Sequence, residues 1–144
     1  MRVRGAGLII RDGRLLVLVY HYPKGDVYAI PGGGLHEGET LAASVTREFQ
    51  EELNLDIQLG ALFCVADMMA QPKIPQTLHV VFRAEILAGE PKLNPAETSA
   101  ASFTWLPLAQ VGEVRLYPAI NRQVLENPAA GLGYIGECQH REWA

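Results

Sequence analysis

The chain has 144 residues, of which 49% are hydrophobic and 19% charged, and its formal net charge is −4. This length suits one compact domain, so we expect a single domain over residues 1–144, with residues 127–144 as a C-terminal tail. The negative net charge argues against a nucleic-acid surface that depends on bulk positive charge.

Neither a membrane segment nor a thiol motif is evident in the sequence. The longest apolar run, residues 15–20, is far shorter than the roughly 20 residues that a membrane-spanning helix needs. Cys64 and Cys138 lack the close spacing of a metal or redox pair. Two such cysteines are typical of proteins whose thiols stay reduced. We therefore expect a cytoplasmic protein that does not bind a membrane.

The N-terminal part of the chain predicts short strands. Residues 3–10 and 15–20 alternate or run apolar, and the dipeptide Asp12-Gly13 between them is a strong signal for a hairpin turn. A further strand is expected at residues 27–30, and it leads directly into the glycines at positions 32–34. Consecutive glycines let a backbone turn sharply and approach a ligand closely.

A helix is predicted over residues 40–53. Apolar side chains recur on one side of it at near-helical spacing: Leu41, Ala42, Val45, Phe49 and Leu53. Glu48, Glu51 and Glu52 stand at i, i+3 and i+4, so their carboxylates are neighbours that repel one another. Glu52 also falls within the apolar side, where a carboxylate is costly unless it is paired or bound to a metal. It is therefore the acid least compatible with a solvated surface.

The second half of the chain predicts strands and then short helices. Residues 68–76 hold Pro72, Lys73 and Pro75 and read as a binding loop. The remaining elements are expected as strands at 57–66, 78–87 and 103–106, a loop at 89–99, a helical turn at 108–111, and a helix at 117–126 with Pro118 near its first turn. Strands on both sides of one helix, followed by a second helix, predict an α+β fold with a mixed sheet between helices.

One long motif joins the glycine run to the acidic helix. The stretch resembles the Nudix box, Gly-x5-Glu-x7-Arg-Glu-U-x-Glu-Glu-x-Gly-U, where U is a bulky aliphatic residue. The positions that match are Gly33, Glu39, Arg47, Glu48, Glu51, Glu52 and Leu55. Phe49 fills the first U position, and Asn54 stands where the pattern has its last glycine. Because Asn is the next-best residue after Gly for a left-handed helix cap, we interpret Asn54 as a structural substitute.

The resemblance implies the Nudix α/β/α sandwich, over about residues 1–126, and a hydrolase that cleaves nucleoside diphosphates linked to another group. It implies Mg²⁺ or Mn²⁺ as the cofactor. By position in the motif, Glu48 and Glu52 are expected as direct metal ligands and Glu51 as a further ligand, with a backbone carbonyl from Gly32 or Gly33. Such a reaction needs charge neutralisation and alignment of the attacking water, and little covalent chemistry.

Two residues of the motif are expected to act mainly by holding it together. Glu39 precedes the helix, where an acid suits the positive end of the helix dipole, and Arg47 can pair with Glu51 one turn away. The general base is left open between a box glutamate, Glu51 or Glu52, and a glutamate of a later loop. Glu97 is the loop residue we favour.

Glu90 and Glu85 are the rivals of that loop base. The residues expected to contact substrate are the close-approaching glycines, Gly33 and Gly34, the loop cation Lys73, and Tyr28, which either stacks on a base or packs. We find no array after the box like that of the NADH-cleaving members. A sugar nucleotide such as ADP-ribose is the favoured substrate, and a nucleoside triphosphate remains open.

Two other functions are kept as alternatives. The first is a Nudix-fold sensor that binds a nucleotide without cleaving it, although the intact acids argue for catalysis. The second is an RNA 5′-end pyrophosphohydrolase, against which the negative net charge argues mildly. The expected partner is thus a small nucleotide-derived molecule, with a homodimer as a possible assembly.

Overall fold

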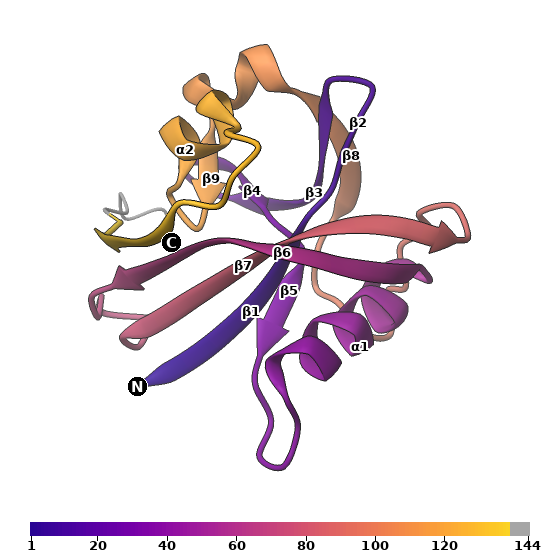
Figure 1. Cartoon of the computed structure of the whole chain (residues 1–144), viewed down its shortest axis with the longest axis horizontal. Coiled ribbons are helices and arrows are strands. Elements are labelled where there is room, and N and C mark those ends of the chain that lie inside the picture. The colour runs from indigo at the N-terminus through magenta and orange to yellow at the C-terminus, as the bar shows by residue number, and fades with distance from the viewer. Residues whose placement is uncertain (139–144) are drawn as a thin grey trace.

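The computed structural model describes residues 1–138, so Trp143 and the rest of the predicted tail beyond Cys138 lie outside it. Strands dominate, and one long helix crosses them (Figure 1). The elements are β1 (Arg2–Leu8), β2 (Ile10–Arg11), β3 (Arg14–Tyr22), β4 (Gly25–Ala29), β5 (Gly32–Gly34), α1 (Leu41–Leu53), β6 (Asp56–Met68), β7 (Thr77–Ala88), β8 (Ser102–Pro107), the 3₁₀ helix η1 (Leu108–Glu113), β9 (Arg115–Tyr117), α2 (Asn121–Glu126) and β10 (Gly133–Glu137).

The strands divide into two five-stranded sheets. The first has the order β10-β6-β7-β1-β5 and is mixed, because β1 runs parallel to β7 while β6 runs antiparallel to it. The second has the order β2-β3-β4-β9, and β8 pairs with β3. The predicted mixed sheet is present, and the chain folds a second sheet beside it.

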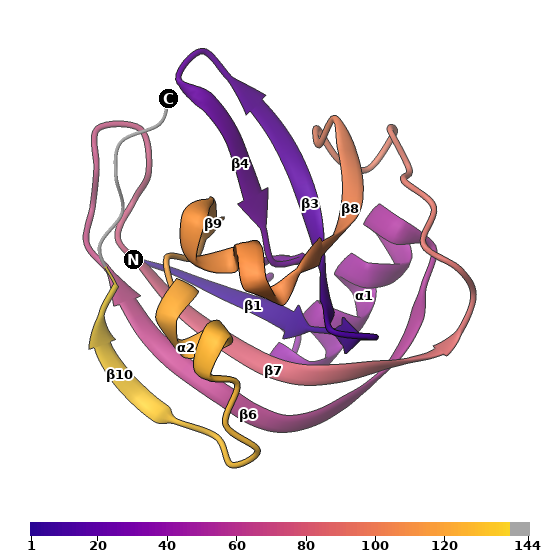
Figure 2. The same ribbon diagram turned by 90° about the horizontal axis from the view of Figure 1, so that it is seen from above.

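Helical segments cover the strands from two sides. Helix α1 contacts β1, β5 and β6, while η1 and α2 pack against each other away from it (Figures 1 and 2). One buried apolar cluster includes Val45, Phe49 and Leu53 of α1, and a second includes Val111 of η1 and Val124 of α2. This arrangement of helices around strands confirms the predicted α+β fold class.

Local sequence signals account for the turn between β2 and β3 and for the start of α1. Asp12 and Gly13 both have positive φ, 53° and 71°, as a two-residue hairpin turn requires. Thr40 begins α1 as its N-cap, and its side-chain oxygen accepts a hydrogen bond from the Ala43 N–H at 3.1 Å. The prediction that Ala42 faces the core is wrong. Ala42 is exposed, because the buried side of the helix is narrower than the predicted one.

The C-terminal elements differ from the predicted ones. The predicted helix at residues 117–126 begins only at Asn121, because Tyr117 pairs with Ala29 in the second sheet and its carbonyl accepts a bond from Ile30. The tail also contributes a strand, which the sequence interpretation missed. Strand β10 runs parallel to β6 at the edge of the first sheet. On either side of β10, the Leu132 and Cys138 N–H groups donate to the carbonyls of Phe63 and Asp67.

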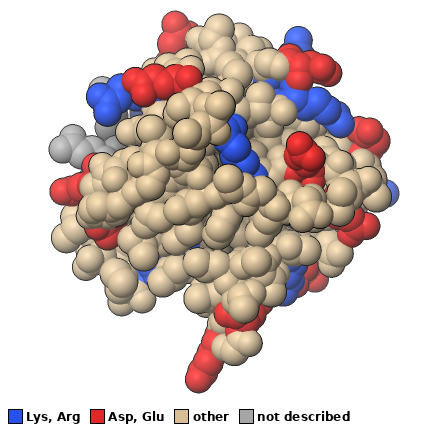
Figure 3. All heavy atoms as spheres, in the orientation of Figure 1, with Lys and Arg blue, Asp and Glu red and all other residues tan. Residues whose placement is uncertain are grey.

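Charged side chains are scattered on the face of the molecule drawn in Figure 3. The area over β6 and β7 is largely uncharged, and side chains of both signs lie around it, so this face carries no broad basic patch. Among residues 1–138, no helix has the length and apolar character needed to cross a membrane.

The end of α1 is a test of how backbone conformation contributes to stability. Asn54 has φ 55° and ψ 37°, and its side chain donates a hydrogen bond to the Lys92 carbonyl at 2.9 Å. Asn54→Ala loses both the tolerated left-handed conformation and this bond. We expect the free energy of unfolding, measured by urea titration, to fall by about 1–2 kcal/mol.

Asn54→Gly is the matched variant, because glycine keeps the left-handed conformation and loses only the side-chain bond. It should therefore destabilise less than alanine. An equal loss in both variants would contradict the role we give to the backbone.

Candidate active site

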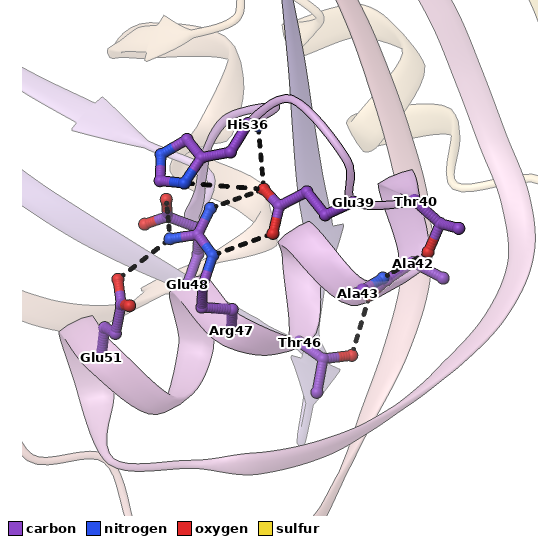
Figure 4. A network of polar contacts seen from close by, with 9 residues as sticks. All are labelled: His36, Glu39, Thr40, Ala42, Ala43, Thr46, Arg47, Glu48 and Glu51. Atoms are coloured by element: carbon purple, nitrogen blue, oxygen red, sulfur yellow. Dashed lines mark hydrogen bonds and ion pairs between the residues drawn. The ribbon is translucent and has the colours of Figure 1, made fainter.

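Arg47 stands at the centre of a network of carboxylates on and before α1 (Figure 4). Its Nε and Nη2 donate to the two oxygens of Glu39 at 3.1 and 2.8 Å. Its Nη1 donates to Glu48 and to Glu51, each at 3.1 Å. One guanidinium thus ties the loop before the helix to two acids of the helix, and a planar group with five donors is suited to such a task.

The loop between β5 and α1 is held by Glu39. Its carboxylate also accepts the backbone N–H of His36 at 2.9 Å. The Arg47 guanidinium, helped by this N–H, lowers the pKa of Glu39 from 4.5 to about 2. Both side chains are largely shielded from solvent. Glu39 and Arg47 therefore hold the loop and the helix in a fixed relative position.

Glu48 lies directly against the glycine run. A Cβ placed on Gly33 would come within 2.3 Å of the Glu48 carboxylate, a distance that no side chain could keep. A Cβ on Gly32 would instead come within 2.0 Å of the Gly5 backbone carbonyl in β1. Gly32 thus allows β5 to lie close to β1, and Gly33 leaves room for the Glu48 side chain of the helix.

Glu52 is the buried acid of the site, with 6% of its surface exposed. Burial, followed by the neighbouring Glu48 carboxylate, raises its pKa above the usual range, while Thr98 and Arg4 oppose the shift. Among residues 1–138, Glu52 Oε1 has no hydrogen-bond partner. A buried carboxylate oxygen without a partner is costly, which is the situation predicted for a metal ligand at this position.

The donor set fits a hard divalent cation. Glu48 and Glu52 bring carboxylate oxygens together beside the Gly33 backbone, and oxygen ligands are those that Mg²⁺ and Mn²⁺ prefer. Glu51 is turned toward Arg47. Accordingly, no three Asp, Glu, His or Cys side chains within residues 1–138 are grouped closely enough to form a complete metal site. The remaining ligands of such an ion would be waters and substrate oxygens.

The loop after β7 packs over the end of α1. The Asn94 N–H donates to the Glu52 carbonyl at 2.9 Å, and Thr98 from the same loop reaches the Glu52 side chain. Glu97 is exposed in a turn of this loop, next to Thr98. The rivals lie elsewhere: Glu90 pairs with Arg11 at 3.6 Å, and Glu85 is an exposed residue of β7.

A cavity of about 290 Å³ adjoins the acids. Gly32, the neighbour of Gly33, lines it, and two more of its residues, Arg4 and Tyr20, interact electrostatically with Glu52. Lys73, which the sequence predicts to contact substrate, lines it, whereas Tyr28 packs against the apolar core and Gly34 lies in β5. The full lining is Arg2, Arg4, Tyr20, Tyr22, Val27, Ala29, Gly32, Lys73, Ile74, Pro75 and Tyr117.

Sequence reasoning missed most of this cavity. Its tyrosines, Tyr20, Tyr22 and Tyr117, come from β3 and β9, which are distant in the chain. The alternation of β3 could have indicated which of its tyrosines share a face, since residues two apart in a strand do. No local signal places Tyr117 beside them, because that contact depends on the pairing of β4 with β9.

The fold and the acidic motif together define a Nudix domain. The family model for the NUDIX domain matches residues 1–127. This chain therefore belongs to the Nudix hydrolase family, which confirms the resemblance carried by the box.

Named relatives are similar over much of this chain. It is 32% identical over 120 residues to an NAD-capped RNA hydrolase of Photorhabdus laumondii, a match that covers 83% of this chain and 44% of the relative. An ADP-ribose pyrophosphatase of Methanocaldococcus jannaschii is 28% identical over 98 residues, or 67% of this chain and 58% of the relative. The chain thus spans less than two thirds of the length of these curated relatives.

Solved structures share the fold. A MutT NUDIX hydrolase from Burkholderia pseudomallei matches with a TM-score of 0.72 at 27% identity, covering 87% of this chain and 95% of that one. A UDP-X diphosphatase matches with a TM-score of 0.73 at 18% identity, covering 92% of this chain and 66% of that one. At the second identity the likeness speaks to the fold alone.

The two glycines that precede α1 should respond differently to alanine. In Gly33→Ala the added Cβ displaces the end of the flexible Glu48 side chain, so we expect about tenfold weaker Mn²⁺ binding with little change in Tm. In Gly32→Ala the Cβ meets backbone, so the free energy of unfolding should fall by about 1–3 kcal/mol or more. Calorimetric titration with Mn²⁺ and thermal unfolding separate the two effects. Unchanged Mn²⁺ affinity in Gly33→Ala would contradict the role of Glu48.

The pairing of Glu39 should make stability depend on pH in the acidic range. Because its pKa is lowered from 4.5 to about 2 in the folded protein, the ionised carboxylate stabilises the fold at and above about pH 4.5. This contribution declines as the pH falls from 4.5 through about 2. We therefore expect the Tm difference between wild type and Glu39→Gln to be largest near neutral pH and to shrink in acid.

Thermal unfolding followed by circular dichroism between neutral pH and about pH 2 measures this difference. Glu37→Gln is the matched control, because Glu37 is an exposed acid of the same loop. A Glu39→Gln difference that stays constant across the pH range would show that the carboxylate charge is not what stabilises the loop.

Proposed function

We propose that this Nudix hydrolase cleaves the pyrophosphate linkage of a nucleoside diphosphate derivative with the help of Mg²⁺ or Mn²⁺. The observation that carries the proposal is Glu52: it is buried, and its Oε1 has no partner among residues 1–138. The Glu48 carboxylate lies beside it. Two carboxylates held together in a partly apolar setting repel each other, and a bound divalent cation would relieve that repulsion.

Each residue of the site has a part in the proposed reaction. A divalent cation, when bound, supplies the positive charge that offsets the phosphates and helps to activate water. Glu48 and Glu52 would hold it, with a backbone carbonyl of Gly32 or Gly33. Arg47 keeps Glu48 and Glu51 oriented and fixes the loop through Glu39. Glu51 is then available as a further ligand, since its side chain is partly exposed.

The proton acceptor in the proposed reaction is Glu97. It lies in the loop that caps the end of α1, one residue from Thr98, which reaches Glu52. An exposed carboxylate on a loop can move toward a reacting water more easily than a buried one can. Glu97→Gln compared with Glu51→Gln assigns the base, because only the base variant should lose its rate without losing Mn²⁺ affinity.

The names of the relatives narrow the class of substrate. One relative is named as an NAD-capped RNA hydrolase and another as an ADP-ribose pyrophosphatase. NAD and ADP-ribose each join a nucleoside diphosphate to a second group. We propose a small sugar nucleotide of this kind, such as ADP-ribose, as the substrate, and a nucleoside triphosphate as the next class to test. The scattered charges of the face in Figure 3 favour a small molecule over a long RNA.

We also propose a cytoplasmic location and a homodimeric assembly. The free, buried cysteines Cys64 and Cys138 support a cytoplasmic location, where thiols stay reduced. A homodimer is the assembly to test by light scattering.

Removing either ligand acid should abolish most of the activity while leaving the fold intact. For Glu52→Gln and Glu48→Gln we expect kcat/KM to fall by about 100-fold or more, because a bound cation contributes several kcal/mol to the transition state. Activity is measured as phosphate released from a panel of nucleotides in the presence of Mg²⁺ or Mn²⁺ and a coupling phosphatase.

Circular dichroism confirms that each variant is folded, and Glu37→Gln serves as the exposed control. Hydrolysis by Glu52→Gln at the wild-type rate would overturn the metal assignment. Tight binding of one nucleotide without turnover by the wild type would favour the sensor. Selective cleavage of capped RNA would favour the RNA alternative.

A further inference from the structure

Arg4 is a buried cation whose hydrogen bonds are incomplete. It lies in β1 with 6% of its surface exposed. Its Nη2 donates to the Ile30 carbonyl at 2.7 Å, and its guanidinium carbon lies 4.9 Å from the centre of the Tyr117 ring. Its Nη1 has no partner among residues 1–138. One end of the side chain is therefore anchored, and the other end carries an unused donor.

An unused donor on a buried guanidinium is a costly feature. Burial lowers the pKa of Arg4, but the group stays charged at physiological pH, so its charge must be compensated. Among residues 1–138, no carboxylate forms an ion pair with it. Its interaction with Glu52 is electrostatic and without a hydrogen bond. Nη1 is therefore a buried donor whose charge and hydrogen bond an anion would satisfy.

Arg83 shows how the same chain treats a structural arginine. Its guanidinium also lies over an aromatic ring, 5.0 Å from the centre of Phe63. It donates to the side chain of Asn127 and to the carbonyl of Pro128, so its bonds join two parts of the fold. Arg4 makes one such bond, leaves Nη1 without a partner among residues 1–138, and lines the cavity.

The cavity around Arg4 has the composition of a nucleotide site. Arg2 and Lys73 add two further cations. The rings of Tyr20 and Tyr22 are stacked with centres 6.5 Å apart and planes 27° from parallel. Cations suit phosphate oxygens, and exposed aromatic faces suit a nucleobase. The volume, about 290 Å³, is near the lower end of the range for small-molecule sites, which suits part of a nucleotide.

We propose that Arg4 binds a phosphate of the substrate: Nη1 donates to a phosphoryl oxygen of the pyrophosphate group whose cleavage occurs beside Glu48 and Glu52. The nucleoside then lies in the cavity against Tyr20 and Tyr22. The identity of the anion as a pyrophosphate rests on the proposed function, whereas the anion site itself rests on the geometry of Arg4. Arg4 would thus align the nucleotide with the acids, in addition to any metal.

The test is calorimetric binding of inorganic pyrophosphate to the whole protein in EDTA. A probe without a base or a metal isolates the contribution of the cation. We expect Arg4→Met to bind pyrophosphate about 10- to 100-fold more weakly than wild type, the effect of one charged hydrogen bond. Arg4→Lys, which keeps the charge but not the fork of donors, should be intermediate.

Arg11→Met is the matched control. Arg11 also lies over an aromatic ring, 4.4 Å from the centre of Trp105, but it pairs with Glu90 outside this cavity. It should bind pyrophosphate as wild type does. Thermal unfolding establishes that each variant is folded. If Arg4→Met fails to fold, Arg4→Lys decides, because its ammonium can still reach toward the Ile30 carbonyl.

Wild-type affinity in the folded Arg4 variants, or no pyrophosphate binding by the wild type, would overturn the proposal. The outcome is independent of turnover. A protein that binds pyrophosphate through Arg4 but hydrolyses no nucleotide would refute the proposed function and leave the anion site standing. Hydrolysis that survives in Arg4→Met with an unchanged KM would do the reverse.

Discussion

The ion-pair network of Arg47 is the interaction on which the site depends. Without it, Glu48 and Glu51 would repel each other one turn apart on α1, and the loop from β5 would lose the ion pair that joins Glu39 to the helix. Because Arg47 is only partly exposed, its pairs are less screened than surface pairs are. The same contacts determine which carboxylate oxygens remain without a hydrogen bond. Glu39 is fully engaged, while Glu52 is left with an unused oxygen.

The fold could be predicted from the sequence where its causes are local. The turn at Asp12-Gly13 and the start of α1 at Thr40 depend on residues within a few positions, and both are where the sequence placed them. Helix α2 and strand β10 depend on distant partners. Tyr117 is extended because β4 lies beside it, and β10 exists because β6 offers an edge. Local propensity carries no information about such partners.

The candidate site likewise has one part that follows from local sequence and another that depends on distant segments. The box residues follow one another on a loop and a helix, so their spacing indicates their chemistry, and burial of Glu52 follows from its place on the apolar side. The cavity is assembled from β1, β3, β4, β5, β9 and the loop before β7, which no single stretch of sequence describes. The loop that contains Lys73 can be recognised in the sequence by its prolines, and Lys73 lines the cavity. Arg4, in contrast, looks like any cation at the start of a strand until its burial is seen.

The box and the cavity have different parts in the proposed reaction. If Glu48 and Glu52 hold the cation as proposed, a shared box would account for a shared reaction at a pyrophosphate, the part that such substrates have in common. The choice between an ADP-ribose-like molecule and a capped RNA would then be made in the cavity, where we propose that the nucleoside lies. Arg4 connects the two regions, because it lines the cavity and acts electrostatically on Glu52. Its side chain is thus where substrate recognition and metal-assisted cleavage would meet.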